Sequence, residues 1–217
     1  GGGPIGLELA QAHARPGSKV TVLAAFAPLG KDDPELTAIV LKKLKDEGID
    51  IRAGIRIERM ERSRGGVRAI VTEDGEEKEI EASHLLVAAG RQANVEGLGL
   101  EEAGIDHDRK GIKVSRGLKT SNRRVYAIGD VAGGLQFTHV ANYHAGIVIR
   151  NALFRLPAKA DDSIIPWVTF TQPELAHVGM TEEQAREKHK SIRVMRWPFA
   201  ENDRAQTDHE TQGLIKV

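Results

Sequence analysis

Apolar residues recur with helical spacing in several stretches of the chain. Helices are expected over residues 4–14, 33–47 and 138–154 and in a stretch that opens at 181–184. The second helix has the clearest boundaries, because Asp33 is an N-cap residue, Pro34 takes the first helical position and Gly48 ends it. The fourth opens with Thr181-Glu182-Glu183-Gln184, which is a capping-box pattern.

Shorter aliphatic runs between these stretches indicate β-strands. Strands are expected over residues 19–24, 49–53, 67–71, 78–80, 85–89, 125–128, 192–195 and 214–217. Asp74-Gly75 lies between the third and fourth strands and is a favoured pair for a tight hairpin turn. The run 85–89 is apolar throughout and indicates a buried strand. The alternation of strands and helices in the first half predicts an α/β fold.

Composition divides the chain into two different parts. Of the nine aromatic residues, only Phe26 precedes residue 125, whereas 17 of the 23 glycines lie at or before Gly117. A glycine-rich, aromatic-poor first half with aliphatic strands favours a nucleotide-binding α/β fold, and the aromatic-bearing end indicates a separate module. The expected linker is the short polar stretch 156–163.

Charge and cysteine content exclude several classes of protein. The 31 basic and 31 acidic side chains cancel, which argues against a nucleic-acid-binding surface. No apolar run approaches the length of a membrane-spanning helix and no secretory signal opens the chain, so a cytoplasmic location is expected. Without cysteine there is no disulfide, thiolate zinc site, iron–sulfur cluster or cysteine nucleophile among these 217 residues.

The first six residues, GGGPIG, match the pattern G-x-G-x-x-G. In a dinucleotide-binding loop, the first glycine permits a tight turn, the second lets a pyrophosphate approach and the third allows close packing of helix and sheet. The pattern normally follows a strand, but nothing precedes Gly1. Either the match is accidental or the chain begins in the middle of a domain.

The position that normally distinguishes NAD from NADP gives no answer. An acidic residue at the end of the second strand would bind the ribose 2′-hydroxyl of NAD, but Ala24 and Ala25 stand there. No arginine favours a 2′-phosphate either, and Lys31 is the nearest cation. The cofactor is therefore NAD or NADP.

Further motifs resemble a known family. They are AAGRQAN at 88–94, YAIGD at 126–130 and PELAHVGMTEEQA at 173–185. Together with the glycine loop, they resemble the flavin-dependent pyridine nucleotide–disulfide oxidoreductases, of the dihydrolipoamide dehydrogenase, mercuric reductase and glutathione reductase type. The resemblance implies Rossmann-like FAD- and NAD(P)-binding domains, followed by part of an α+β dimerisation domain. Ala89, Ala93 and His139 depart from the residues common in the family.

The resemblance also implies cofactor-binding roles for ten positions. These are Gly1, Gly3, Gly6, Glu8, Gly90, Asp130, Gln136, Phe137, Thr138 and His139. The glycines of the loop would bind the pyrophosphate of the nicotinamide dinucleotide, and Glu8 would face its nicotinamide end. Asp130 would bind the ribityl part of FAD, with residues 136–139 running along the flavin. By itself, Asp130 could instead cap the turn that follows it.

The implied domains are an NAD(P)-binding domain over 1–92 that lacks its first strand, the second part of an FAD-binding domain over 93–160, and the start of a truncated dimerisation domain over 161–217. We therefore expect an internal fragment of a homodimeric enzyme that passes hydride between nicotinamide and flavin, and then to a disulfide or related substrate. No catalytic or metal-binding residue is expected here, since the family's cysteine pair is absent, and the isolated chain is expected to be inactive.

Two other functions stay open at this point. One is a different two-dinucleotide flavoprotein, such as a ferredoxin-type reductase, although the segment from Trp167 onward argues against it. The other is a non-catalytic module that binds nucleotide or partner proteins. A second glycine loop and a cysteine pair encoded upstream of Gly1 would favour the disulfide reductase over the binding module.

Overall fold

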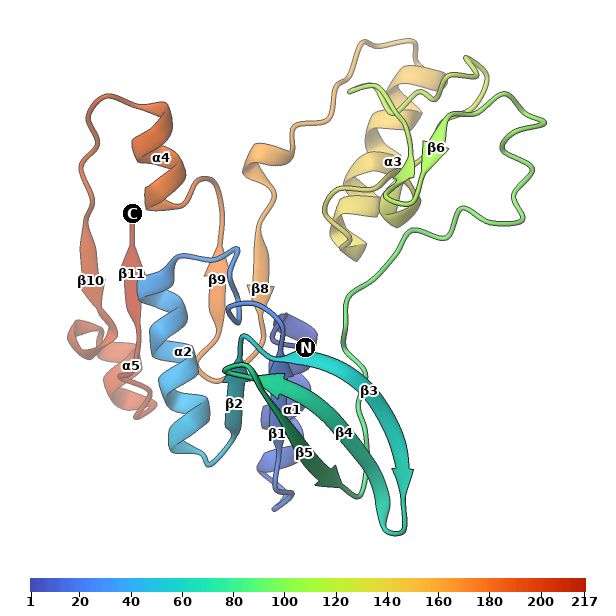
Figure 1. Ribbon diagram of the computed structural model, residues 1–217. Coiled ribbons are helices and arrows are strands. Elements are labelled where there is room, and N and C mark those ends of the chain that lie inside the picture. The colour runs from blue at the N-terminus through green and yellow to red at the C-terminus, as the bar shows by residue number, and fades with distance from the viewer. The chain divides into compact units, whose positions relative to one another are not determined.

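The computed structural model describes residues 1–217 and divides them into two compact units (Figure 1). The first unit consists of residues 1–90 and 166–217, and the second of residues 91–165. The first unit therefore joins two stretches that lie far apart in the sequence. The three-part division expected from the sequence stays a prediction.

The first stretch of the first unit begins with a helix–strand–helix–strand arrangement. Its elements are α1 (Pro4–Ala14), β1 (Thr21–Ala24), α2 (Pro34–Asp46) and β2 (Asp50–Ala53). The two strands pair in parallel, and α2 is the crossover between them. All four elements were predicted, and both strands are shorter than expected. Leu7, Val40 and Leu44 are almost fully buried in the core of this part.

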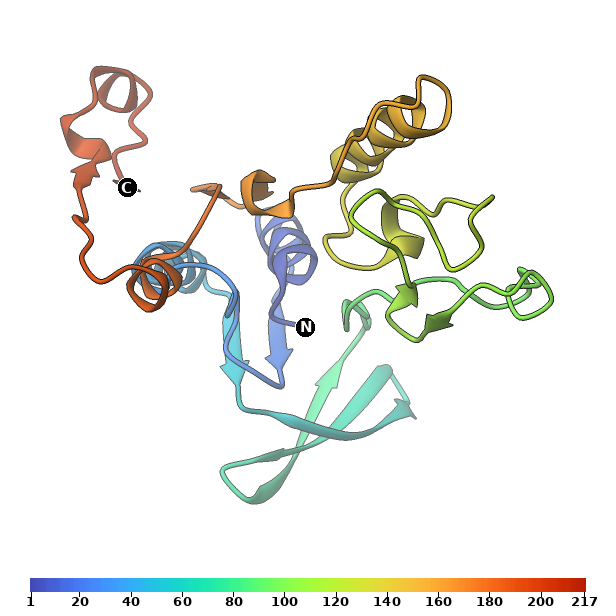
Figure 2. The same ribbon diagram turned by 90° about the horizontal axis from the view of Figure 1, so that it is seen from above.

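A second, antiparallel sheet follows, with β3 (Arg56–Ser63), β4 (Gly66–Glu73) and β5 (Glu76–Ala82) in that order. Both views show it as a curved sheet that continues from β2 (Figures 1 and 2). Asp74 and Gly75 have φ angles of 54° and 82°, as the tight hairpin turn requires, so the predicted hairpin is confirmed. β3 was not predicted, because charged residues lie on both of its faces. Its pairing with β4 identifies it as a strand.

The second stretch of the first unit contains short elements. They are β8 (Trp167–Thr169), β9 (Leu175–His177), α4 (Glu182–Lys188), β10 (Arg196–Pro198), the 3-10 helix η3 (Phe199–Glu201), α5 (Asp203–Thr207) and β11 (Leu214–Lys216). The capping box at Thr181 and Gln184 is confirmed. The strand expected over 192–195 is wrong, because the ladder with β11 begins only at Arg196. Met195 still exchanges two backbone hydrogen bonds with Val217, of 2.7 and 3.0 Å.

The two stretches of the first unit pack closely on each other. Leu175 is buried in the same apolar cluster as α1 and α2. The Gln11 amide donates to the carbonyl of Gln172 (2.9 Å) and accepts from its N–H (2.8 Å), and Gln11 is itself buried. The indole of Trp167 donates to Asp32 (2.8 Å). The bonds of Gln11 fix the loop after β8 against the α1 helix, and the bond of Trp167 attaches β8 to the loop before α2.

The second unit has little regular structure apart from one long helix. It contains β6 (His107–Asp108), β7 (Gly111–Ile112), the 3-10 helix η1 (Gly129–Ala132), α3 (Thr138–Ala152) and the 3-10 helix η2 (Asp162–Ile164). The strand expected over 125–128 is wrong: only Tyr126 pairs, in a single bridge to Lys119. The α3 helix is the longest in the structure, and no helix is long and apolar enough to cross a membrane.

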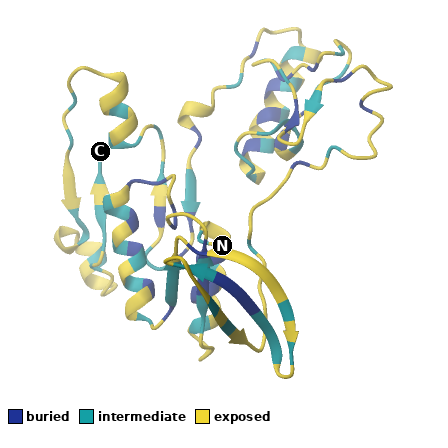
Figure 3. Ribbon diagram, viewed as in Figure 1, coloured by how far each residue is buried: buried dark blue, intermediate teal, exposed yellow.

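The buried strand expected over 85–89 is also wrong. These residues have no regular structure, and most of the stretch is exposed (Figure 3). Val87 is 76% exposed. The stretch passes beside Gly1, but no strand of the chain forms a ladder with it. A parallel strand is buried only where neighbours cover both faces and supply hydrogen bonds, and apolar character cannot replace them.

Candidate functional site

The glycine loop lies at the start of α1, and its three pattern glycines are in different surroundings. A Cβ atom on Gly6 would lie 1.9 Å from the carbonyl oxygen of Gly1, and one on Gly1 would lie 2.0 Å from that of Ala88. A Cβ atom on Gly3 would meet no atom within 4 Å. Gly1 and Gly6 therefore allow close packing, whereas Gly3 leaves space above the backbone.

The N-terminus of α1 has the properties of an anion-binding site. Gly3 is its N-cap with extended backbone, no side chain caps the helix and Pro4 has no N–H. The N–H groups of Ile5 and Gly6 therefore point out of the helix start without a partner, together with the positive end of the helix dipole. The open space at Gly3 and these free donors fit the pyrophosphate of a dinucleotide.

Glu8 lies one turn further along α1 and binds the second stretch of the first unit. Its Oε1 atom accepts a hydrogen bond from the backbone N–H of Phe170 (2.8 Å). Glu8, which the resemblance places at the nicotinamide end of the dinucleotide, therefore also fixes the loop after β8. Its role toward a nicotinamide stays a prediction.

The carboxyl end of β1 offers no free carboxylate. Ala24 is buried there, and the next acidic residues are Asp32 and Asp33. Both are buried, Asp32 against the indole of Trp167 and Asp33 as the N-cap of α2. Lys31 is exposed and forms no ion pair. Neither acidic side chain is therefore available to a ribose 2′-hydroxyl.

Gly90 ends the first unit, and its φ of +109° is a conformation that residues with a side chain rarely adopt. A Cβ atom there would meet nothing within 4 Å, so the backbone conformation requires glycine and the packing does not. The structure thus places Gly90 at the point where the chain passes from one unit to the other.

Asp130 lies in η1 of the second unit with its carboxylate exposed and without a hydrogen-bond partner. The turn after it is closed by the backbone, since Gly133 N–H donates to the carbonyl of Asp130 (3.1 Å). The carboxylate therefore does not cap the turn. Gly129 has a φ of +66°, and a Cβ atom on it would lie 2.9 Å from the Cβ of Ala141 in α3.

Residues 136–139 lead into α3. Phe137 is the N-cap without a side-chain cap, and its ring stacks on that of His139 with 5.2 Å between centroids. Arg91 donates to the carbonyl of Gln136, and Thr138 is the first residue of the helix. An exposed carboxylate and a helix start in the same unit fit the hydroxyls and the polar edge of a flavin cofactor.

The sequence analysis missed the part played by His144. It is buried on α3, where Nδ1 accepts a hydrogen bond from Gly129 N–H (3.2 Å). His144 therefore anchors the turn that presents Asp130. Its spacing from the buried Val140 and Ile147 indicated an inward-facing position, but a hydrogen bond to a turn fifteen residues earlier leaves no local pattern.

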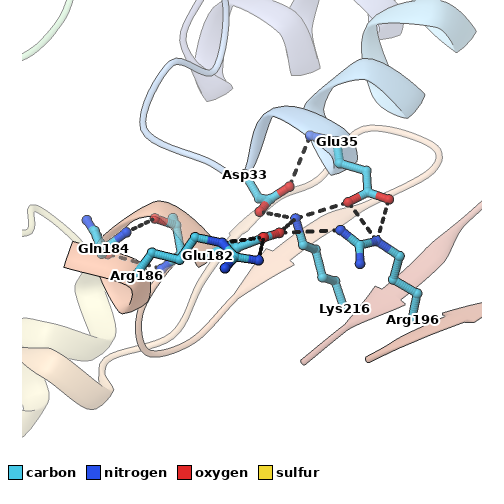
Figure 4. A network of polar contacts seen from close by, with 8 residues as sticks. Asp33, Glu35, Glu182, Gln184, Arg186, Arg196 and Lys216 are labelled. Atoms are coloured by element: carbon cyan, nitrogen blue, oxygen red, sulfur yellow. Dashed lines mark hydrogen bonds and ion pairs between the residues drawn. The ribbon is translucent and has the colours of Figure 1, made fainter. Parts of the chain in front are cut away.

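A network of charges joins the start of α2 to the second stretch of the first unit (Figure 4). The ammonium of Lys216 lies 2.7 Å from Asp33, 3.0 Å from Glu35 and 2.7 Å from Glu182. Arg196 adds a 2.8 Å pair with Glu35. This network holds the N-terminus of α2 in place.

The network shifts the pKa of its members. Hydrogen bonds from Arg196 and Lys216 lower the pKa of Glu35 to about 2, and bonds from Lys216 and Arg186 lower the pKa of Glu182 to about 2. Burial acts to lower the pKa of Lys216, but its bonds to the carboxylates outweigh burial and raise it above its ordinary value. Glu35, Glu182 and Lys216 are therefore charged at neutral pH. No cluster of side chains in the structure could hold a metal ion.

Two protein-family sequence models match the chain. One, described as pyridine nucleotide-disulphide oxidoreductase, matches residues 1–145. The other, described as the dimerisation domain of pyridine nucleotide-disulphide oxidoreductases, matches residues 165–217.

Similar proteins cover the whole chain. A mercuric reductase of Staphylococcus aureus is 38% identical over 219 aligned positions, which include 100% of this chain and 40% of the relative. A dihydrolipoyl dehydrogenase of the same species is 39% identical, and 47% of it is covered. The Cu(II) complex of the HOCl-induced flavoprotein disulfide reductase RclA from Escherichia coli has a TM-score of 0.90 at 36% identity, over 100% of this chain and 49% of that one. The chain thus spans less than half the length of these relatives.

Proposed function

Because the chain belongs to the pyridine nucleotide-disulphide oxidoreductase family, as its motifs indicated, we propose that it supplies the nicotinamide dinucleotide site and part of the flavin site of an FAD-dependent NAD(P)H oxidoreductase. Members of this family use FAD and NAD(P)H. The observation that carries the proposal is the glycine loop. Close packing requires glycine at Gly1 and Gly6, and Gly3 leaves open space beside the uncapped start of α1.

In the first unit, residues 1–6 bind the dinucleotide. The N–H groups of Ile5 and Gly6 would donate hydrogen bonds to the pyrophosphate, and the open space at Gly3 would admit it. Glu8 faces the nicotinamide end, and Gly90 lies where the chain passes to the unit that binds the flavin. Since the end of β1 has no free carboxylate, the site does not reject a 2′-phosphate by charge, and both NAD and NADP are accepted.

In the second unit, Asp130 accepts hydrogen bonds from hydroxyl groups of the flavin's ribityl chain. His144 and Gly129 hold the η1 turn that carries Asp130 against α3. Residues 136–139, as Gln136, Phe137, Thr138 and His139, lie along the cofactor at the helix start.

When bound, nicotinamide and flavin supply hydride transfer, and the side chains of this chain bind and orient them. The overall reaction would reduce a disulfide or a related substrate, as the names of the relatives indicate for those proteins. The chain has no cysteine, so thiol chemistry needs groups from outside these 217 residues. The match of residues 165–217 to a dimerisation domain supports a homodimer. A cytoplasmic location stays a prediction from the sequence.

The Gly3→Asp variant tests the dinucleotide site. Aspartate is a good N-cap, and its Cβ atom has free space at this position, so α1 is expected to remain folded. Its negative charge would occupy the phosphate approach. NADH and NADPH are titrated separately by fluorescence, and affinity for each is expected to fall by about tenfold or more.

Gly3→Ala is the matched control, because it adds only a methyl group and should weaken binding less. Thermal unfolding of both variants shows whether the fold is intact. Unchanged NADH and NADPH affinity in a folded Gly3→Asp variant would contradict the proposal.

A further inference from the structure

The second unit contains a cavity of about 550 Å³. Besides four cations, its lining includes Gly117, Tyr126, Asn151, Leu156, Pro157 and Ala158. These residues come from two stretches, 115–126 and 151–159, which meet at the C-terminal end of α3. The volume lies within the range of small-molecule sites.

The charges around the cavity have one sign. Its lining includes four cations, Arg116, Lys119, Arg155 and Lys159, and no acidic residue. None of the four forms an ion pair, whereas Arg15, Arg68 and Arg196 in the first unit all do. A concave surface with charge of one sign focuses its field and attracts ions of the opposite sign.

Hydrogen bonds fix the two walls to each other. The amide of Asn151 donates to the carbonyls of Gly117 (3.2 Å) and Ala158 (2.9 Å) and accepts from Ala158 N–H (2.7 Å). Arg116 and Ala160 exchange two bonds, from the Arg116 Nε (3.2 Å) and to the Arg116 carbonyl (2.7 Å). The cavity is therefore formed by ordered backbone.

Each wall also contains a residue other than glycine with left-handed backbone. Leu118 has a φ of 63° and is buried, and Arg155 has a φ of 55°. Such conformations cost free energy and persist only where the surroundings impose them, which is often at ligand sites. In this cavity they set the direction of the segments that carry Arg116 and Arg155.

The cavity differs from the candidate flavin site of the same unit. That site lies at the N-terminal end of α3, and a helix of 15 residues is about 22 Å long. Nor does the helix dipole account for the cations, since it corresponds to about half a negative charge at the C-terminus, whereas four full positive charges line the cavity. Asp161 and Asp162 line an adjacent cavity that shares Ser115 and Arg116 with this one, and there Asp161 accepts two bonds from Ser163.

We propose that this cavity binds a small anion that carries phosphate groups. Guanidinium groups match phosphate oxygens with paired hydrogen bonds, and lysines add charge. Tyr126, whose ring lies 5.5 Å from the Lys119 ammonium, and the side chains of Leu156 and Pro157 are apolar parts of the lining that can contact the remainder of such a molecule. Its lining includes neither the glycine loop nor residues 129–139 of the candidate flavin site.

The test titrates the full chain with pyrophosphate and with ADP by calorimetry, in the Gly3→Asp background, so that phosphate binding by the glycine loop is weakened. Saturable binding is expected, and the double variant R116Q/R155Q should weaken it by about tenfold or more. R123Q/R124Q is the matched control, since it removes the same charge from an exposed turn of the same unit outside the cavity and should change affinity less than about twofold.

Tighter binding of ADP than of pyrophosphate would indicate that the natural ligand is a nucleotide. Equal binding would indicate that it is a phosphate compound without a nucleoside. Both results support the site. Absence of saturable binding by the parent chain, or equal loss in the two double variants, would overturn it. Thermal unfolding checks that R116Q/R155Q is folded. A folded double variant that binds both probes like the parent also overturns the proposal.

Discussion

The imidazole of His144 illustrates how one side chain can control a functional turn. Its Nδ1 accepts the hydrogen bond from Gly129, so the ring is the neutral tautomer with its proton on Nε2. Gly129 itself cannot hold a side chain, because Ala141 lies too close. Together these two residues determine where Asp130 is presented.

Replacement of His144 by leucine should therefore destabilise the chain. The buried Gly129 N–H would lose its partner, which costs about 1–3 kcal/mol in the free energy of unfolding. Urea unfolding measures this loss. His84→Leu is the control, because His84 is exposed and bonds only to Ser83. Equal stability of the two variants would show that the bond to Gly129 is unimportant.

At the scale of elements, local signals were sufficient for helices and tight turns. The N-cap at Asp33 and the turn at Asp74-Gly75 act within a few residues, so both were predictable. The strands expected over 85–89 and 125–128 failed, since a strand exists only where another strand supplies its hydrogen bonds. β3 is the opposite case, a strand that was not predicted. Its sequence is charged, but pairing with β4 stabilises it.

The charge network at the start of α2 depends on Lys216, whose side chain is only 9% exposed. Its replacement by methionine leaves Asp33, Glu35 and Glu182 facing one another. We expect the free energy of unfolding to fall by about 1–3 kcal/mol at neutral pH, measured by urea unfolding. Lys42→Met is the control, because its pair with Asp46 is exposed.

The same variant should change the pH dependence of stability. The pKa values of Glu35 and Glu182 are lowered from 4.5 to about 2, so their contribution is complete above pH 4.5 and is lost as the pH falls toward 2. Without Lys216, this acid-induced loss of stability should become smaller. An identical pH profile for Lys216→Met and the parent chain would rule out the network as its source.

At the scale of the whole molecule, much apolar surface is exposed. Leu85, Leu86 and Val87 are 48%, 46% and 76% exposed, and the parallel sheet contains only β1 and β2. Unpaired edges and contiguous apolar segments favour association. This exposure agrees with a chain that spans less than half the length of its relatives.

The purified chain should therefore self-associate as its concentration rises, which sedimentation velocity would measure. The double variant L86K/V87K should reduce this association by placing charges on the exposed segment. Phe26→Lys is the control, since Phe26 is an isolated ring that is 84% exposed. A monomer at all concentrations with a sharp unfolding transition would contradict this expectation.

The sequence by itself determined the family, the cofactor chemistry and the positions of the motifs, because short-range patterns carry them. Glycines at fixed spacing and an N-capped helix require only neighbouring residues. Tertiary structure decided which charged groups are already engaged, as with Glu8 on Phe170 and Asp32 on Trp167, and it brought Arg116 and Arg155 to one cavity. Such contacts join residues that lie far apart in the sequence, and only the packing of elements brings these residues together.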